Sequence, residues 1–415
     1  MNAELITIGD EILIGQVVDT NSAYLAGELN KIGISVIRIT SVPDSREHII
    51  QALEDAGTRS QLIITTGGLG PTSDDITKHT LAAWFGSKLV SNPAVLEHIR
   101  NLLGSRGVEI NELNVKQAEL PDNCELLHNP AGTAQGMWFE KNGKPYISLP
   151  GVPFEMKAIY RDVLEQKLKQ RFNLPQIRHL TVLTQGVPES RMATMIRDWE
   201  AGLPPVLKLA YLPSPGILRL RLTEISQADQ GNYGNVLEDE AKKLEAIIGK
   251  YIFGYNNDRL EAIVGDLLKE HGFTLSLAES CTGGVISGLI TSVPGSSAYY
   301  KGGLTAYSNE MKTSELNVSP YTLLINGAVS QSVAEQMADG ARTKYKTDFA
   351  VAVTGIAGPS GGSAEKPVGT TWIAVASKKR IVSNLHNFGE DRGRNIQKAA
   401  IAALFMLRNE IKDCL

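Results

Sequence analysis

A serine late in the chain stands in a glycine-rich turn, Glu279–Gly284 (ESCTGG). The apolar run before it (FTLSLAES) is typical of a buried strand, and a helix is expected after it. Glycines keep side chains away from the backbone at such a turn, and the N–H groups of the following helix are expected to face a bound group. Ser280 can therefore serve as a nucleophile beside oxyanion-type donors, or it can simply cap the helix.

Two side chains could activate Ser280 as a base. His271 precedes the strand at its far end and is expected at the surface. Lys312 lies in Tyr307–Lys312 (YSNEMK), and a lysine becomes a useful base when desolvation or nearby positive charge depresses its pKa. Serine–lysine pairs are an established variant of the serine triad. The alternative is a solvated lysine, the usual state of a lone one.

A second glycine-rich turn, Val353–Gly362 (VTGIAGPSGG), follows another predicted strand. Backbone that a ligand can approach closely suits a phosphate or a sugar, although a mobile loop would have a similar composition. Ligands of parallel sheets bind at the carboxyl ends of the strands. The Ser280 turn, the Tyr307–Lys312 segment and this turn are expected at the strand ends of one sheet. Their convergence favours a ligand site.

The N-terminal part contains a third turn of this kind, Gly67–Thr77 (GGLGPTSDDIT), after the buried strand LIITT. Its glycines and the following helix N-terminus suit an anionic group. Asp74 and Asp75 suit a divalent cation that bridges to that group, although an aspartate N-cap is the alternative. Further oxygen donors are offered by Asp10, Glu11, Asp19 and Asn21.

Alternating strand and helix patterns must position these turns. Residues 4–9 and the run SVIRITSV predict strands, residues 20–32 predict a helix, and EHIIQALEDA predicts another. This alternation indicates an α/β fold with a mainly parallel sheet and right-handed crossovers. The changes in texture along the chain predict an α/β domain over residues 1–170, a small α+β domain over 171–256 and a second α/β domain over 257–415.

Composition narrows the class of protein. At 415 residues the chain is too long for one ordinary core. A net charge of -4 gives no support to a generally basic nucleic-acid surface. The cysteines fit no zinc or disulfide pattern, which indicates a reducing compartment. Without a basic leading segment or a membrane-length apolar run, we expect a cytoplasmic protein that binds neither membrane nor nucleic acid.

The motifs AESCTGG, AYSNEMK and AVTGIAGPSGG resemble, in order and spacing, the C-terminal domain of the CinA family. The resemblance implies a nicotinamide-mononucleotide deamidase that needs no cofactor. It implies that Ser280 is the nucleophile, Lys312 its base and Tyr307 an assisting hydroxyl. The implied reaction is attack on the carboxamide, release of ammonia, and hydrolysis of the acyl-enzyme to nicotinate mononucleotide.

The same resemblance implies the substrate-binding residues and shows one departure from the family. The implied set is Thr282, Gly283, Gly284, Thr354, Gly355, Ile356, Ala357, Gly358 and Arg392. Arg392 keeps the phosphate role, because a guanidinium binds phosphate with two parallel hydrogen bonds. Gln397 stands where the family has a second arginine. Cys281 is expected to be a small buried thiol beside the nucleophile.

The N-terminal motifs, together with Asn129–Ala134 (NPAGTA) and Leu149–Pro153 (LPGVP), resemble the molybdopterin-binding fold of molybdenum-cofactor biosynthesis proteins and of CinA. In CinA the resemblance implies an ADP-ribose pyrophosphatase that uses a divalent metal ion, Mg²⁺ or similar. The domain could also bind a nucleotide without cleaving it. The implied nucleotide-binding residues are Thr66, Gly67, Gly68, Gly70, Thr72 and Asn21, and the implied metal residues are Asp10, Glu11, Asp74 and Asp75.

The middle part is similar to the KH-like insert of full-length CinA proteins, including KLAYLPSPGILRLRLT. RNA-binding KH modules clamp the RNA backbone with a Gly-x-x-Gly loop, and we expect none between Pro175 and Gly254. The run Glu238–Glu240 is acidic, so spacing or dimerisation is a better expectation than RNA binding. The family resemblance also implies a homodimer. Two further hypotheses stay open, a non-catalytic nucleotide-binding sensor or scaffold and a molybdopterin-binding protein.

Overall fold

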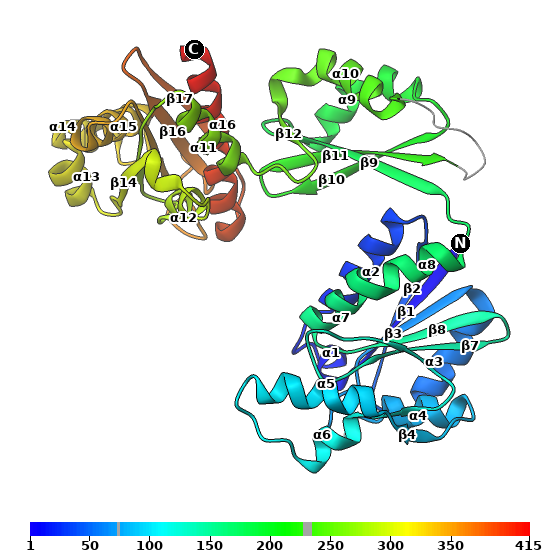
Figure 1. The fold of residues 1–415 in the computed structure, drawn as a ribbon. Helices are drawn as coiled ribbons and strands as arrows, with labels where there is room; N and C mark the ends of the chain where they lie inside the picture. Colours follow the sequence, from blue (N-terminus) through cyan, green and yellow to red (C-terminus); the bar gives the residue numbers. More distant parts are fainter. Residues whose placement is uncertain (73–74, 227–234) are drawn as a thin grey trace. The chain divides into compact units, whose positions relative to one another are not determined.

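The strand and helix alternation of the N-terminal part builds a six-stranded sheet in the order β2-β1-β3-β8-β7-β6 (Figure 1). The computed structural model describes residues 1–72, 75–226 and 235–415. β1 runs parallel to β2 and β3, β3 runs parallel to β8, and β7 and β6 continue antiparallel, so the predicted mainly parallel sheet is confirmed. The strands are β1 (Asn2–Ile8), β2 (Ser35–Val42), β3 (Leu62–Thr66), β6 (Glu125–Leu127), β7 (Gly136–Lys141) and β8 (Lys144–Leu149). A separate pair is formed by β4 (Leu89–Ser91) and β5 (Glu119–Pro121).

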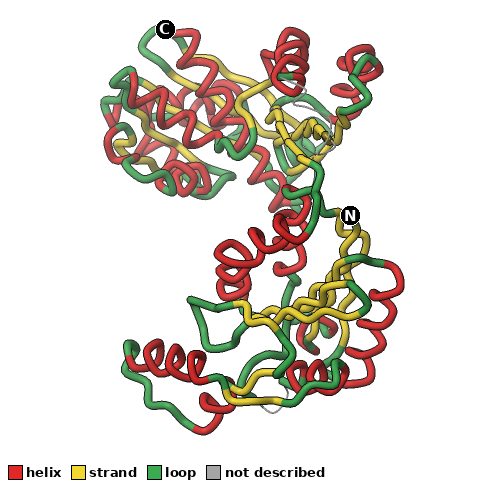
Figure 2. The backbone as a smooth tube through the Cα atoms, turned by 45° about the vertical axis from the view of Figure 1, so that its right-hand side comes forward, coloured by secondary structure: helices red, strands yellow, loops and turns green. Residues whose placement is uncertain are grey.

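Helices cover both faces of this sheet (Figure 2). Leu5 of β1 packs into one core and Ile6 into the other, because successive strand side chains point to opposite faces. β1 is buried on both faces from Ala3 to Ile8, and its buried charged residue Glu4 forms an ion pair with Arg59. The helices are α1 (Asp10–Leu13), α2 (Thr20–Lys31), α3 (Arg46–Arg59), α4 (Thr77–Trp84), α5 (Pro93–Gly104), α6 (Glu112–Gln117), α7 (Pro153–Ile159), the π-helical turn η1 (Tyr160–Leu164) and α8 (Glu165–Arg171).

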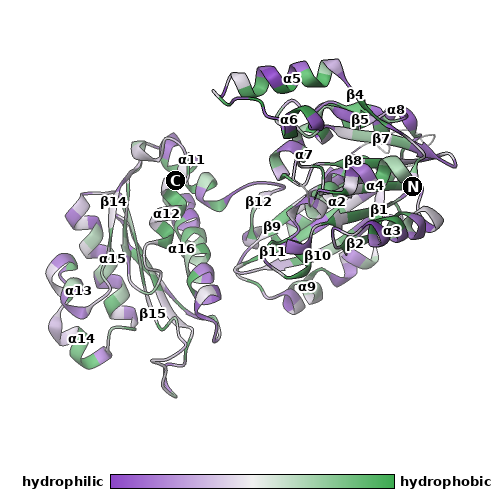
Figure 3. Cartoon of the chain, turned by 90° about the horizontal axis from the view of Figure 1, so that it is seen from below, coloured by the Kyte–Doolittle hydropathy of each residue, from purple (hydrophilic) through white to green (hydrophobic). Residues whose placement is uncertain are grey.

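Helix α5 shows how the sequence sets a surface helix. The Asn92 side chain accepts hydrogen bonds from the backbone N–H groups of Ala94 and Val95, and Pro93 occupies the first turn. Val95 and Ile99, four residues apart, are the buried positions. Green and purple residues therefore alternate along α5 in Figure 3.

The chain divides into two compact units, Met1–Arg178 and most of the stretch from His179 to Leu415. The second unit begins with an antiparallel sheet in the order β10-β11-β9-β12. Its elements are β9 (Gln176–Thr184), α9 (Glu189–Ala201), β10 (Leu207–Ser214), β11 (Ile217–Ser226), α10 (Val236–Ile248), η2 (Gly249–Tyr251) and β12 (Ile252–Tyr255). The expectation that this part has no Gly-x-x-Gly stretch is wrong, because residues 231–234 read GNYG; these residues lie outside the described part of the chain.

The C-terminal part forms a five-stranded sheet in the order β14-β13-β15-β16-β17. β13 runs parallel to β14 and β15, and β16 and β17 continue antiparallel. Its strands are β13 (Leu275–Glu279), β14 (Tyr300–Thr305), β15 (Phe349–Gly355), β16 (Thr370–Ala376) and β17 (Ile381–Asn387). Its helices are α11 (Leu260–Glu270), α12 (Val285–Thr291), η3 (Ser296–Ala298), α13 (Asn309–Leu316), α14 (Pro320–Asn326), α15 (Gln331–Tyr345) and α16 (Arg392–Cys414).

The two faces of this sheet are packed differently. The face toward α11, α12 and α16 carries larger side chains such as Leu277 and Val351. The opposite face carries alanines, including Ala350 and Ala352, against small residues of α15. The parallel pairing of β13, β14 and β15 brings their carboxyl ends to one edge, where the segments after Glu279, Thr305 and Gly355 begin. No helix among the described residues is long and apolar enough to cross a membrane.

Candidate active site

Ser280 and Lys312 meet at the edge where β13 and β14 end. Ser280 directly follows β13, and its backbone N–H donates to the Val353 carbonyl over 3.0 Å. Lys312 lies on α13, which begins after the Ser308 N-cap, and its Nζ is 3.0 Å from Ser280 Oγ. Lys312 is 2% exposed and Ser280 8%. The structure thus brings the predicted nucleophile and its predicted base into hydrogen-bond contact.

The environment of Lys312 favours the neutral amine. Burial lowers the pKa of Lys312 from its usual value, because desolvation disfavours the charged form. Its Nζ donates to the Ala306 carbonyl over 2.9 Å, and among the described residues no carboxylate forms an ion pair with it. A neutral amine beside a hydroxyl can accept the hydroxyl proton, so the pair has the arrangement of a nucleophile and its base.

Cys281, next to the predicted nucleophile Ser280, has a different environment. It packs in the apolar core of the sheet, and the predicted buried thiol is confirmed. Burial raises the pKa of the Cys281 thiol to about 12. A thiol is reactive as the thiolate, which is scarce at neutral pH when the pKa is this high.

The start of α12 differs from the sequence-based expectation. Glu279, 1% exposed, folds its carboxylate back over the helix and accepts the backbone N–H groups of Gly284, Ile286 and Ser287 over 2.8–3.1 Å. These N–H groups therefore do not face a ligand. Gly284 precedes the helix with φ 101°, a left-handed value that glycine adopts without steric cost.

The donors left at this turn come from the segment directly after the nucleophile. Among the described residues, the N–H groups of Cys281 and Thr282 donate to no backbone carbonyl. The Thr282 hydroxyl is buried and has no hydrogen-bond partner in the described part of the chain. The N–H of the residue after a serine nucleophile is a recurrent oxyanion donor. Cys281 and Thr282 thus offer the backbone donors that α12 does not.

Tyr307 and Arg392 lie on the open side of the same edge. Tyr307 is 60% exposed and Arg392 is also exposed. Arg392 Nη2 donates to Tyr307 Oη over 3.1 Å, and Arg392 Nη1 donates to the Gly358 carbonyl over 2.8 Å. The structure therefore joins the predicted assisting hydroxyl, the predicted phosphate ligand and the glycine-rich loop.

The glycine-rich loop after β15 is held by its neighbours. The Thr354 hydroxyl donates to the Ala328 carbonyl over 2.8 Å, and the Ile356 N–H donates to the Thr370 carbonyl over 2.8 Å. Asn395, 2% exposed, donates from Nδ2 to the carbonyls of Ala357 and Gly389. Sequence reasoning missed Asn395, although a polar residue at the start of the apolar face of α16 was a signal. Gln397 is exposed on the same helix.

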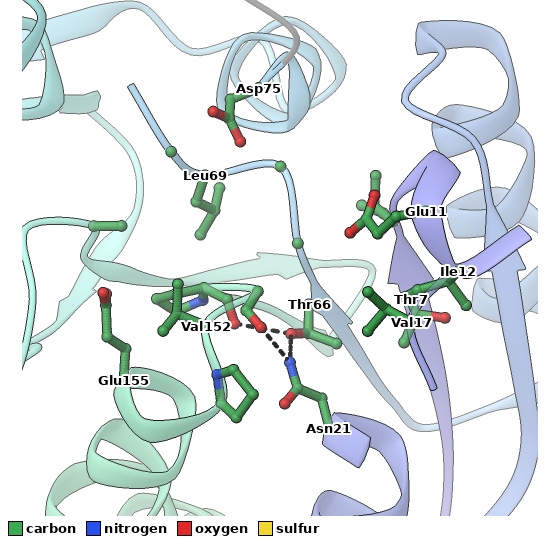
Figure 4. A pocket seen from close by; sticks show the side chains of 18 of the residues that line it. Thr7, Glu11, Ile12, Val17, Asn21, Thr66, Leu69, Asp75, Val152 and Glu155 are labelled. Carbon is green, nitrogen blue, oxygen red and sulfur yellow. Dashed lines mark hydrogen bonds between the residues drawn. The ribbon is translucent and has the colours of Figure 1, made fainter. Parts of the chain in front are cut away.

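The N-terminal turns line a cavity of about 520 Å³ (Figure 4). Asn21 Nδ2 donates to Thr66 Oγ1 over 3.1 Å and to the Gly151 carbonyl over 2.7 Å, which ties α2 to the ends of β3 and β8. Asn21 Oδ1 is buried and has no partner in the described residues. At Gly67, φ is 116° and a Cβ atom would lie 2.0 Å from the Ile8 carbonyl, so glycine is required there.

Carboxylates dominate the charged groups of this cavity. Glu11 and Asp75 point into it in Figure 4, and Asp75 accepts hydrogen bonds from the Thr72 N–H over 3.0 Å and the Thr72 hydroxyl over 2.5 Å. Asp44, which sequence reasoning missed, also lines it. Burial raises the pKa of Asp44, and the neighbouring charges of Asp10 and Glu11 raise it further. The signal for Asp44 was its position two residues after β2.

These carboxylates fit a divalent cation only in part. All the donors are oxygens, which suits Mg²⁺, and a cation would relieve the repulsion around Asp44. Among the described residues, however, no three carboxylate, imidazole or thiol groups converge closely enough to share one ion. The predicted ligand Asp74 lies outside the described residues. Glu155, also missed, lines the opposite side and accepts from Asn129 Nδ2 over 2.7 Å.

Comparison with known proteins follows the same division of the chain. Family models match in three places, a probable molybdopterin binding domain over residues 4–170, the damage-inducible protein CinA KH domain over 179–254 and the CinA C-terminal domain over 257–411. The fold is thus an α/β protein with a molybdopterin-binding-like first domain, a KH-like middle domain and a CinA C-terminal domain.

Relatives match along the whole chain. A CinA-like protein of Cytophaga hutchinsonii is 48% identical over 99% of this chain and 98% of its own length. A putative competence-damage inducible protein of Caldicellulosiruptor saccharolyticus is 40% identical over 99% of both chains. The crystal structure of competence/damage inducible protein CihA from Agrobacterium tumefaciens is 40% identical over 37% of this chain and 93% of that one, with a TM-score of 0.36. The chain belongs to the CinA family.

Proposed function

We propose that the C-terminal domain is an amidohydrolase that converts nicotinamide mononucleotide to nicotinate mononucleotide and ammonia. The observation that supports this most strongly is the 3.0 Å contact between Lys312 Nζ and Ser280 Oγ, with a buried lysine that forms no ion pair among the described residues. A buried lysine with a lowered pKa, next to a serine, can act as its base.

The proposed reaction has two halves. Lys312 takes the Ser280 proton as Oγ bonds to the carboxamide carbon, and the negative charge on the carboxamide oxygen is stabilised by the N–H groups of Cys281 and Thr282. The lysine then gives its proton to the departing nitrogen, the C–N bond breaks and ammonia leaves. Water attacks the ester carbon, Lys312 takes a proton from that water, and the acid is released as the proton returns to Ser280 Oγ.

Ammonia release from nicotinamide mononucleotide tests this function. We expect wild-type protein to release ammonia, and Ser280→Ala and Lys312→Ala to lose at least about 10³-fold in kcat, since removing a nucleophile or its base leaves little of the chemistry. Cys281→Ala is the matched control, because it keeps the backbone N–H and should stay within about threefold of wild type. Binding of the nucleotide without ammonia release from wild type would instead favour a nucleotide-binding sensor.

For the N-terminal domain we propose hydrolysis of the pyrophosphate of ADP-ribose with a divalent metal ion. Support comes from the carboxylates that share the cavity and from the glycine-rich turn at its wall. Asp10, Glu11, Asp74 and Asp75 would hold the ion, with Asp44 beside them, and the ion would neutralise phosphate charge. Asp75→Asn should lower the hydrolysis of ADP-ribose at least about 100-fold while the melting temperature stays near that of wild type. Unchanged hydrolysis in Asp75→Asn would remove Asp75 from this role.

A further inference from the structure

Arg392 connects three segments of the C-terminal domain through one side chain. It is the first residue of α16, where the Asp391 side chain caps the helix by accepting the Arg394 N–H over 2.7 Å. Its Nη1 donates to the Gly358 carbonyl after β15, and its Nη2 donates to the Tyr307 hydroxyl after β14. The guanidinium therefore fixes the distance between the glycine-rich loop and Tyr307.

The hydrogen-bond capacity of Arg392 exceeds these two contacts. A guanidinium carries five N–H donors in a planar fork, and no other acceptor for Arg392 lies among the described side chains. Three donors are thus left for an anion. Arg392 can hold a phosphate while it keeps its bonds to Gly358 and Tyr307.

The same contact holds the Tyr307 hydroxyl oxygen in place. A phenol has one hydrogen, and because Tyr307 Oη accepts from Arg392, that hydrogen is free to point toward another acceptor. The ring is 60% exposed, so packing alone does not fix it. In the described part of the chain, Arg392 is the hydrogen-bond partner of this hydroxyl. Without Arg392 the hydroxyl would rotate freely in solvent.

We propose that Arg392 is a positioning residue for Tyr307 in addition to being a phosphate ligand. Its fork holds the Tyr307 hydroxyl with the hydrogen directed to the substrate carboxamide, and its remaining N–H groups take the phosphate of the same nucleotide. Phosphate binding and hydrogen-bond donation at the reacting end are thus joined by one guanidinium. This inference rests on the proposed amidohydrolase activity.

Arg392→Lys separates the two roles, because lysine keeps the positive charge but offers a single nitrogen without the planar fork. We expect Arg392→Lys to lower kcat about 30-fold, matching Tyr307→Phe, since a misplaced catalytic group costs up to about 100-fold. In Arg392→Lys/Tyr307→Phe, kcat should fall no further than in Tyr307→Phe alone. Arg392→Met, which lacks donors altogether, is a second variant with the same expectation for kcat.

The unphosphorylated substrate provides the decisive comparison. Nicotinamide riboside has the same carboxamide but no phosphate, so a residue that only binds phosphate has no effect on its turnover. We expect the kcat loss of Arg392→Lys to persist with nicotinamide riboside. Arg392→Lys should also raise KM for the mononucleotide, and this rise in KM should be absent with nicotinamide riboside. Arg394→Lys is the matched control, because it changes an arginine in the same helical turn that has no side-chain bond among the described residues.

Each outcome decides the matter. Multiplicative losses of kcat in the double variant, or normal turnover of nicotinamide riboside by Arg392→Lys and Arg392→Met, would overturn the positioning role and leave the proposed function standing. No ammonia from wild-type protein with the mononucleotide would overturn the proposed function together with this inference. Equal losses in the Arg394→Lys control would assign the effect to the helix start and also overturn it.

Discussion

The amine of Lys312 forms hydrogen bonds with the protein, but no carboxylate among the described residues forms an ion pair with it. Its nitrogen donates to Ser280 Oγ and to the Ala306 carbonyl, and its side chain is almost fully buried. Burial penalises the protonated form of Lys312, so its pKa is lowered. Burial of the amine therefore makes the folded protein resist protonation at this position, which is the property that the proposed base needs.

The lowered pKa of Lys312 predicts how stability depends on pH. Between the folded pKa and the unfolded value the unfolded chain binds more protons, so the free energy of unfolding rises with pH across that window. We expect the melting temperature of wild-type protein, relative to Lys312→Met, to increase as the pH is raised from 7 toward 10. The measurement is thermal unfolding of both proteins across this range. A constant difference would mean that Lys312 keeps the same pKa in both states.

The pH dependence of catalysis should also reflect the titration of Lys312. The base is active only when neutral, so kcat/KM for the amide substrate should rise with pH through the pKa of Lys312 and level off below pH 10.5, its usual value. A pH–rate profile measures this directly. Cys281→Ala should keep the same profile, because the Cys281 thiol has a pKa of about 12 and packs in the core. A profile that moves in Cys281→Ala would contradict the assignment to Lys312.

Among single residues, the sequence predicted those site residues that lie in a recognisable local motif. Ser280 could be found because it follows an apolar strand pattern in a glycine-rich turn, and Lys312 because it lies in the motif Tyr307–Lys312 (YSNEMK). Glu279, Asp44 and Asn395 were missed as site residues for a physical reason. Their roles depend on the side-chain orientation in the folded turn, and the sequence pattern does not predict that orientation. The Glu279 carboxylate, for example, turns back over the start of α12.

Among the elements, α12 depends most on one side chain. The backbone N–H groups of Ile286 and Ser287 donate to the buried Glu279 carboxylate, which also accepts a hydrogen bond from the Ser287 hydroxyl over 2.7 Å. A carboxylate that accepts several hydrogen bonds at a helix N-terminus stabilises that end through bonding and through the helix dipole. The turn that carries Ser280 is therefore held between β13 and a capped helix.

Glu279→Gln tests the importance of this cap. The amide keeps the shape but replaces one acceptor oxygen by a donor, which then faces N–H groups. We expect the free energy of unfolding to fall by about 2 kcal/mol, in line with hydrogen bonds to charged groups, and kcat to fall as the Ser280 turn loosens. Chemical denaturation measures the first effect. Glu270→Gln at the exposed end of α11 is the control and should change neither quantity.

The elements themselves were partly predictable. β15 is an apolar run over residues 349–353 that is buried on both faces, which is the pattern of a central strand. β14 (YKGGLT) escaped prediction, because its two glycines weaken the strand signal and its burial alternates. A side chain at Gly303 would be crowded there, since its Cβ atom would lie 3.0 Å from the Leu277 carbonyl oxygen of the neighbouring strand.

For the whole molecule, the two candidate sites draw their residues from different compact units. The cavity of the N-terminal domain is lined by residues 7–155, and the Ser280–Lys312 pair, Tyr307 and Arg392 lie within residues 280–392. The described residues of each candidate site therefore all belong to one unit. The predicted domain limits of 1–170, 171–256 and 257–415 stay predictions, and the family matches fall close to them.

Because the described residues of the two candidate sites share no partner, a substitution in one should leave the chemistry of the other unchanged. Additivity holds for distant sites that share no partners. We expect Ser280→Ala to abolish ammonia release while ADP-ribose hydrolysis stays within about twofold of wild type. Asp75→Asn should do the reverse, and the double variant should lose both activities while its melting temperature stays that of the single variants. Loss of ammonia release in Asp75→Asn would show that the two units are coupled. Calorimetry would then measure the binding of each nucleotide to both variants. It would show whether the coupling acts on affinity or on the chemical step.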